Sequence, residues 1–240
     1  MDTPRSYEAT YRVRFDEADA TGHLRPSGLL RYAQDVAWQH SEAAGFDRDW
    51  YDARGTLWLV RMATLRLQGV ARYGDHLRAI TKVTAWRRMW VRRRTRFVGS
   101  DGEAMAEVDT DWVLVTTAGR PTRIPDEISH YFAPGSRYKR ESVSLDPSCG
   151  DARSFELDVR AALVDPMAHL NHAAYLDVVD EAVMPLASDA FRATDYRIEY
   201  VRPALAGTSL RVRAWSATHG SYACQMLDQE GAESCRAMVR

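Results

Sequence analysis

The apolar positions of the chain follow two different periods. In two segments they recur every three or four residues, which is typical of one buried face of an α-helix. The first helix is expected from about Pro26 to Ala44, because proline suits a first helical turn and Gly45 suits a C-terminal cap. The second is expected to start near Asn171 or His172 and to end before Ser188.

Elsewhere apolar and polar residues alternate, and β-branched and aromatic side chains are frequent, which is typical of β-strands. Such segments include YRVRF, LWLVRMATLRL, LRAITKVTAW, SFELDVRAALV and SLRVRAWSA. Turn residues at 99–102 and near Gly119 predict hairpins. Each half of the chain therefore has one long helix followed by several antiparallel strands. The expected fold class is α+β, with one curved antiparallel sheet wrapped around one central helix in each half.

Two stretches of the chain resemble each other. In EADATGHL, Asp19 precedes His23 by four residues, and in VDPMAHL, Asp165 precedes His169 by four residues, at a constant offset of 146. Segments that read as strand, glycine turn and strand follow both copies at an offset of 133, so the first copy carries about 13 additional residues. The repeat predicts two domains of the same fold.

The stretch between the two copies is polar and contains several serine, glycine and proline residues. This composition is typical of a linker that crosses a protein surface. We therefore expect an N-terminal domain over residues 1–135, a linker over residues 136–153 and a C-terminal domain over residues 154–240.

Composition narrows the class of protein. With 45% hydrophobic and 27% charged residues the chain is typical of a globular protein, and 32 basic against 33 acidic side chains give a formal charge of −1. This balance argues against nucleic acid or a membrane surface as partner. No signal segment or membrane-spanning stretch is evident, and the three cysteines form no CxxC pair. We expect a cytoplasmic protein without metal or cofactor.

The loop with Asp-x-x-Gly-His, the central helix and the hairpin-rich sheet together resemble the hotdog fold of acyl-thioester enzymes. Two such units in one chain resemble the acyl-ACP thioesterase family, and the likeness is carried by RFDEADATGHL, RPTRIPDEI and DPMAHLNHAAYLDVV. The resemblance implies two tandem hotdog domains and hydrolysis of a fatty acyl thioester, on acyl carrier protein (ACP) or CoA, to a free fatty acid and a thiol. It also implies an N-terminal domain that shapes the acyl tunnel and a C-terminal motif that carries catalysis in fatty acid biosynthesis.

The C-terminal signature of that family is Asp-x-Asn-x-His-Val-Asn-Asn, and Asp165, His169 and Asn171 match it here. A carboxylate can act as general base or nucleophile towards a thioester, and amides at the tip of the following helix can stabilise the oxyanion. The histidine could orient the carboxylate, and Asn171 could donate to the substrate carbonyl. Each residue could instead have a purely structural role. Asp165 could form a turn, His169 could contact the backbone, and Asn171 could cap the helix.

The signature is incomplete. Met167 replaces its inner asparagine, and a further acid and cysteine of plant members align with Pro203 and Ala204. The plant constellation therefore does not transfer whole, and Asp19 and His23 of the first repeat are secondary catalytic candidates.

Other polar residues have weaker functional interpretations. Strand alternation places Arg92, Arg94 and Arg96 on one face, which predicts either a solvated sheet face or a docking surface for an acidic carrier protein or the phosphates of CoA. Glu181, with Asp177 and Asp180, is expected on a solvated helix face.

Two other functions compete with hydrolysis: a hotdog hydratase or dehydratase, and an acyl-thioester binding protein that has lost catalysis. Hydratases tend to have Asp-x-Asn-Pro-x-His, one residue wider than the spacing from Asp165 to His169. Further assembly into a homodimer is left open.

Overall fold

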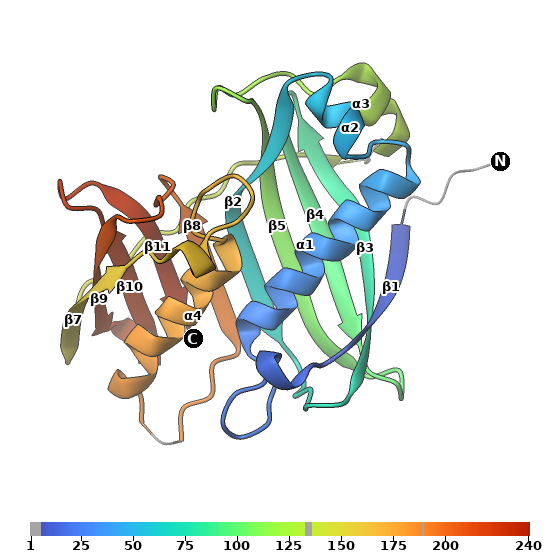
Figure 1. The fold of residues 1–240 in the computed structure, drawn as a ribbon. Coiled ribbons are helices and arrows are strands. Elements are labelled where there is room, and N and C mark those ends of the chain that lie inside the picture. The colour runs from blue at the N-terminus through green and yellow to red at the C-terminus, as the bar shows by residue number, and fades with distance from the viewer. Residues whose placement is uncertain (1–5, 133–135, 189) are drawn as a thin grey trace. The chain divides into compact units, whose positions relative to one another are not determined.

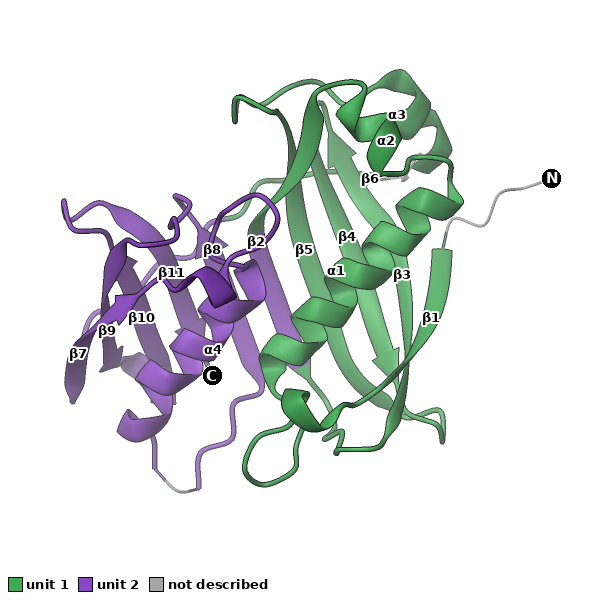
Figure 2. Cartoon of the chain, viewed as in Figure 1, with its two compact units in different colours: residues 1–61, 67–141 green, residues 62–66, 142–240 purple. Residues whose placement is uncertain are grey.

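The computed structural model describes residues 6–132, 136–188 and 190–240. The chain forms two compact units (Figure 2). The first holds the residues up to Arg61 together with Leu67–Glu141, and the second holds Met62–Arg66 together with Ser142–Arg240. Met62–Arg66, which belongs to the second unit, lies within the strand Thr56–Leu67. Each unit is described separately below.

The first unit is a sheet with strand order β1-β3-β4-β5-β2. Helix α1 packs against β1, β3 and β5 and crosses one face of this sheet (Figure 1). The elements are β1 (Ser6–Arg12), a 3-10 turn η1 (Phe15–Glu17), α1 (Pro26–Ala43), α2 (Arg48–Asp52), β2 (Thr56–Leu67), β3 (His76–Arg87), β4 (Trp90–Val98), β5 (Ala104–Thr116), α3 (Asp126–Phe132) and β6 (Ser136–Arg137).

The second unit repeats this plan with strand order β7-β9-β10-β11-β8. Helix α4 packs against β9, β10 and β11, and β8 also pairs antiparallel with Met62–Arg66 of β2. The elements are β7 (Ala152–Asp158), η2 (Ala161–Leu163), α4 (His172–Val183), η3 (Met184–Leu186), β8 (Asp195–Tyr200), β9 (Ser209–Ser216), η4 (Thr218–Gly220), β10 (Tyr222–Leu227) and β11 (Glu233–Val239).

The matching strand orders confirm the predicted α+β class, in which one antiparallel sheet accompanies one central helix in each half of the chain. The two long helices lie where their apolar periods predict them. Helix α1 ends at Ala43, and Gly45 follows with a φ of +84°, a conformation that glycine adopts without strain. Helix α4 starts at His172 after an Asn171 cap.

Two short helices of the first unit were not predicted. Helix α2 occupies the additional residues of the first repeat, and α3 follows the RPTRIP segment. Both contribute to one buried cluster beside the sheet, in which α2 supplies an aromatic residue and α3 supplies two apolar residues. The cluster consists of Phe46, Tyr51, Val91, Leu114, Ile124, Ile128 and Phe132.

The polar segment between the two units also departs from a featureless linker. Strand β6 pairs parallel with the end of β3. Tyr138 is buried in the first unit, where its hydroxyl donates to Asp111 Oδ2 at 3.0 Å. Val143 is buried in the second unit, where its N–H donates to Glu199 Oε2 at 2.9 Å. Single apolar residues therefore anchor a segment whose composition is that of a loop.

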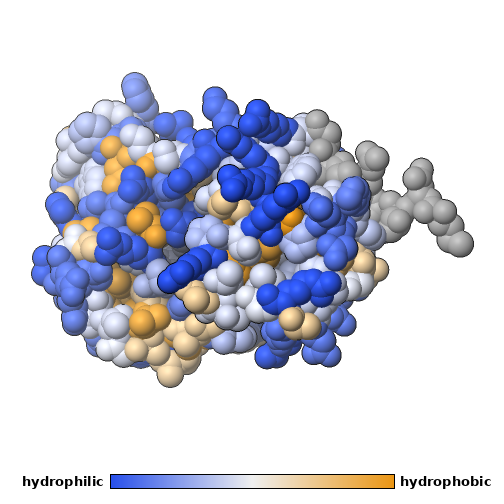
Figure 3. Space-filling view, turned by 90° about the horizontal axis from the view of Figure 1, so that it is seen from above, coloured by the Kyte–Doolittle hydropathy of each residue, from blue (hydrophilic) through white to orange (hydrophobic). Residues whose placement is uncertain are grey.

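The face shown in Figure 3 is mainly hydrophilic, and hydrophobic residues occur on it in small scattered patches. Such a distribution is ordinary for a protein surface in water. None of the helices in the described ranges has the length and apolar character that crossing a membrane requires.

Candidate functional site

The Asp165 loop is closed by bonds from its own backbone and carboxylate. The Asp165 N–H donates to the His169 carbonyl at 2.8 Å, and the Asp165 carbonyl accepts from Ala168 N–H at 2.9 Å. Its Oδ1 accepts from the amides of Met167 (2.9 Å) and His169 (3.3 Å). The side chain is half-buried. Within the described residues Oδ2 makes no hydrogen bond, so one carboxylate oxygen holds the loop and the other is available to a substrate or water.

The Asp19 loop has the same backbone pattern, which confirms the repeat at the level of individual hydrogen bonds. Its Oδ1 accepts from Thr21 N–H (2.8 Å), Thr21 Oγ1–H (2.7 Å) and His23 N–H (3.0 Å), and the residue is exposed. Burial raises the pKa of Asp19, but these hydrogen bonds outweigh it and lower the pKa below its ordinary value. Gly22 has a φ of +83°, and Ala168 at the matching position has +60°.

The predicted histidines lie in these loops without orienting the carboxylates through their rings. In the second unit the contact between His169 and Asp165 uses the His169 amide, and the imidazole makes no hydrogen bond to any described residue. In the first unit His23 Nδ1 lies 3.0 Å from Thr21 Oγ1. A direct catalytic role for either ring stays a prediction.

Asn171 is the N-cap of α4. Its Oδ1 accepts from Ala173 N–H at 2.9 Å, and its carbonyl accepts from Ala174 N–H at 2.8 Å. Two of the helix-tip amides that were predicted to stabilise an oxyanion therefore already have partners. The Asn171 Nδ2 group makes no hydrogen bond within the described chain, so it keeps two donors for a ligand.

The remainder of the motif is anchored to the second sheet. Leu170 N–H donates to the Ala204 carbonyl at 2.8 Å, and Ala204 N–H donates to the Tyr175 hydroxyl at 3.1 Å. The Tyr200 hydroxyl donates to the His172 carbonyl at 2.9 Å. Ala204 thus contributes backbone bonds at a position where the resemblance implies reactive chemistry.

The predicted arginine face exists, and its charges are paired with acids on the neighbouring strand β5. Arg92 and Arg94 each make a two-bond fork with an aspartate, with distances of 2.7 to 2.9 Å, and Arg96 makes a longer pair at 3.4 Å. The pairs are Arg92–Asp111, Arg94–Asp109 and Arg96–Glu107. Because this row is largely neutralised, a carrier-docking role for it stays a prediction.

Asp180 departs from its expected place on a solvated helix face, whereas Glu181 is exposed as expected. The Tyr196 hydroxyl of β8 donates to Asp180 Oδ1 at 2.8 Å. Burial raises the pKa of Asp180 to about 7, although the Tyr196 hydrogen bond opposes this shift. A helical projection did not predict this contact because it depends on which sheet residue faces the helix.

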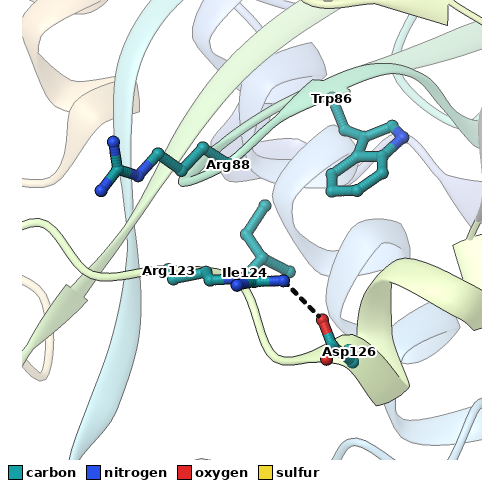
Figure 4. A pocket seen from close by; sticks show the side chains of 5 residues that line it. All are labelled: Trp86, Arg88, Arg123, Ile124 and Asp126. Atoms are coloured by element: carbon teal, nitrogen blue, oxygen red, sulfur yellow. Dashed lines mark hydrogen bonds and ion pairs between the residues drawn. The ribbon is translucent and has the colours of Figure 1, made fainter.

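The first unit also contains a pocket of about 380 Å³, shown in Figure 4. It is lined by Trp86, Arg88, Arg123, Ile124 and Asp126, and Arg123 Nη2 donates to Asp126 Oδ1 at 3.1 Å. Within the described residues no group of three or more histidine, cysteine, aspartate or glutamate side chains could hold a metal ion.

The same strand order around one helix, found twice, defines a double hotdog architecture. A similar fold occurs in an acyl-ACP thioesterase from Bacteroides thetaiotaomicron, with a TM-score of 0.82, 15% identity and coverage of 98% of this chain and 97% of that one. It also occurs in the 12:0-ACP thioesterase from Umbellularia californica, with a TM-score of 0.82 and 20% identity. That comparison covers 99% of this chain and 97% of the other. A Staphylococcus aureus protein in complex with CoA is similar over part of the chain, with a TM-score of 0.51 and 11% identity. The match covers 58% of this chain and 95% of that protein.

The family model of the acyl-ACP thioesterase N-terminal domain matches residues 4–132. The chain therefore belongs to the acyl-ACP thioesterase family, and its enzyme class is thioester hydrolase. Comparison with curated protein sequences gives no match.

Proposed function

We propose that the protein hydrolyses a fatty acyl thioester on acyl carrier protein or CoA and that Asp165 is its catalytic carboxylate. The observation that carries this assignment is that the two oxygens of the Asp165 carboxylate are bonded differently. Two loop amides donate to Oδ1, whereas Oδ2 makes no hydrogen bond to the described residues. A base held in one orientation but still able to accept a proton is what general-base catalysis needs.

In the proposed reaction Asp165 Oδ2 accepts a proton from a water molecule as the water oxygen attacks the thioester carbon. The carbon–sulfur bond then breaks, the thiolate leaves, and the proton held by Asp165 passes to the thiolate sulfur. The Asn171 Nδ2 group donates to the carbonyl oxygen while negative charge develops there. Direct attack by the carboxylate, followed by hydrolysis of the resulting anhydride, gives the same products.

Asp19 is the weaker candidate for this role. It is exposed, its Oδ1 already accepts three hydrogen bonds, and its lowered pKa makes it a poorer base than an ordinary aspartate. We propose that the first unit instead holds the acyl chain between α1 and its sheet.

The experiment that tests the function is thiol release, followed with a chromogenic disulfide, from saturated acyl chains of several lengths on both carriers. We expect release of free fatty acid and thiol in equal amounts. Absence of release from every substrate, with binding retained, would favour an acyl-thioester binding protein. The replacement of the plant acid and cysteine by Pro203 and Ala204 supports this alternative. Hydration of an enoyl thioester without thiol release would favour the hydratase.

Asn171 allows capping and catalysis to be separated. Asn171→Ala removes the cap of α4 and is expected to lower the free energy of unfolding by about 1 kcal/mol, whereas Asn171→Ser retains a capping oxygen and should cost much less. Both variants lose the Nδ2 donor, so both are expected to lower kcat by roughly 100-fold. Chemical unfolding and thiol-release assays measure the two effects. Normal turnover of Asn171→Ser would leave this residue with a capping role alone.

A further inference from the structure

The inner face of the first sheet, which packs against α1, is mostly apolar but carries several buried polar groups on β3 and β4. Arg93 of β4 is only 7% exposed and points to the side opposite Arg92 and Arg94. Along the same face, Thr95 Oγ1 donates to Thr81 Oγ1 at 3.0 Å, and both threonines are buried. The two threonines satisfy each other, whereas a buried charge is costly unless it is paired.

The guanidinium of Arg93 is a buried cation without an acidic partner. Its Nη1 donates to His40 Nδ1 of α1 at 2.9 Å, and its central carbon lies 5.4 Å from the centroid of the Phe132 ring. No carboxylate of the described residues lies within ion-pairing distance, whereas Arg92 and Arg94 on the outer face are both paired. Burial lowers the pKa of Arg93 to about 10, so the group is still charged at neutral pH.

Other fixed polar groups lie around this cation. Ser41, next to His40 on α1, has its Oγ 3.0 Å from the Tyr51 hydroxyl, and Trp58 Nε1–H donates to the same hydroxyl at 3.0 Å. Tyr51, Phe132 and Ile124 belong to the same buried cluster of the first unit. Trp86 packs against this cluster. Trp86 and Ile124 also line the pocket of Figure 4, so this pocket borders the cluster that contains Phe132, the ring over which the Arg93 guanidinium lies.

We propose that Arg93 binds the free carboxylate at the far end of a dicarboxylic acyl group, so that the substrate of this thioesterase is a monothioester of a dicarboxylic acid. This proposal rests on the proposed function, in which the acyl chain lies between α1 and the first sheet. His40 lies on α1 and Arg93 on β4, and the two side chains meet at 2.9 Å. The cation therefore lies between the helix and the sheet of the first unit, where the far end of the bound acyl chain is proposed to lie.

The charge of Arg93 favours an anionic group over a neutral one. Removing a charge from water is costly unless an opposite charge and hydrogen bonds compensate it, and an ω-carboxylate supplies both. A methyl group at the same place would leave the guanidinium uncompensated. A hydrogen bond between charged groups corresponds to a preference of roughly 10- to 100-fold.

The experiment compares two thioesters of equal length, dodecanoyl-CoA and the mono-CoA thioester of dodecanedioic acid, by thiol release, with the same pair loaded on acyl carrier protein. We expect kcat/KM for the dicarboxylic substrate to exceed that for the plain one by roughly 10-fold or more. Arg93→Met, which keeps the length of the side chain without its charge, should abolish or reverse this preference. Lys82→Met, which removes an exposed positive charge from the neighbouring strand β3, is the control and should preserve it.

A second readout does not depend on catalysis or on the variant. The monoamide of dodecanedioic acid, which carries one carboxylate, should raise the Tm of the wild-type protein more than dodecanamide does, and Arg93→Met should lose the difference. If Arg93→Met does not fold, the two ligands on the wild-type protein decide the question. A wild-type preference for the plain chain in both assays, or an unchanged preference in folded Arg93→Met, would show that Arg93 is a structural cation only. Absence of thiol release together with selective stabilisation by the monoamide of dodecanedioic acid would overturn the proposed function but not this inference.

Discussion

Replacing Asp165 with asparagine is expected to lower kcat/KM for thioester hydrolysis by about 100-fold or more, because the variant removes the general base. The substitution is nearly isosteric. The amide oxygen can still accept from the amides of Met167 and His169, so the loop should keep its conformation. Thiol release measures the rate, and the Tm of the variant reports whether the fold is intact.

Asp19→Asn is the matched control, since Asp19 occupies the same loop of the first repeat. It is expected to retain most of the activity. The opposite result, a full rate in Asp165→Asn and a large loss in Asp19→Asn, would transfer catalysis to the first unit. Equal losses of activity in both variants would show that catalysis cannot be assigned to either loop alone.

Replacing Asp180 with asparagine is expected to remove a pH-dependent loss of stability. Burial raises the pKa of Asp180 in the folded protein to about 7 from its ordinary value of 3.8. The stability that this group contributes is therefore fully present below about pH 4 and is lost as the pH rises through about 7. In Asp180→Asn the side chain stays neutral, and its amide oxygen can still accept from the Tyr196 hydroxyl.

Relative to the wild type, Asp180→Asn should therefore gain about 2 to 3 kcal/mol in the free energy of unfolding between about pH 5 and about pH 8. Urea unfolding followed by tryptophan fluorescence across this range measures the gain. Glu181→Gln is the control, because the neighbouring side chain is exposed and its replacement should leave the pH dependence unchanged. A constant difference between wild type and Asp180→Asn would contradict a neutral, buried Asp180.

The features that were predictable from the sequence are those set by nearby residues. The turn chemistry of Asp165 and the capping by Asn171 involve partners two to four positions away, so a short motif is sufficient to predict them. The repeat was detectable because both loops use the same local bonds. The two long helices were recognisable because their apolar faces extend over several turns.

The features that were missed depend on neighbours from distant segments. The helical projection put Asp180 among solvated residues, but Tyr196 of β8 lies against it. Strand alternation places Arg93 opposite the arginines of the outer face. Only the fold shows that α1 covers this side and that no acid of the described residues pairs with Arg93. Helices α2 and α3 span five and seven residues, which is too short for a sustained period.

The assignment of Met62–Arg66 to the second unit affects how the chain can be divided. These residues pair with β8 along five consecutive positions, although Leu67–Glu141, which belongs to the first unit, lies between them and the start of the second unit's main segment at Ser142. A fragment beginning at Ser142 would carry its own helix and five strands but would present the β8 edge without a partner. Unpaired edges of this kind recruit other chains. The C-terminal half thus depends on a donated strand segment, and excising it at the polar connection would yield an association-prone piece rather than an autonomous enzyme.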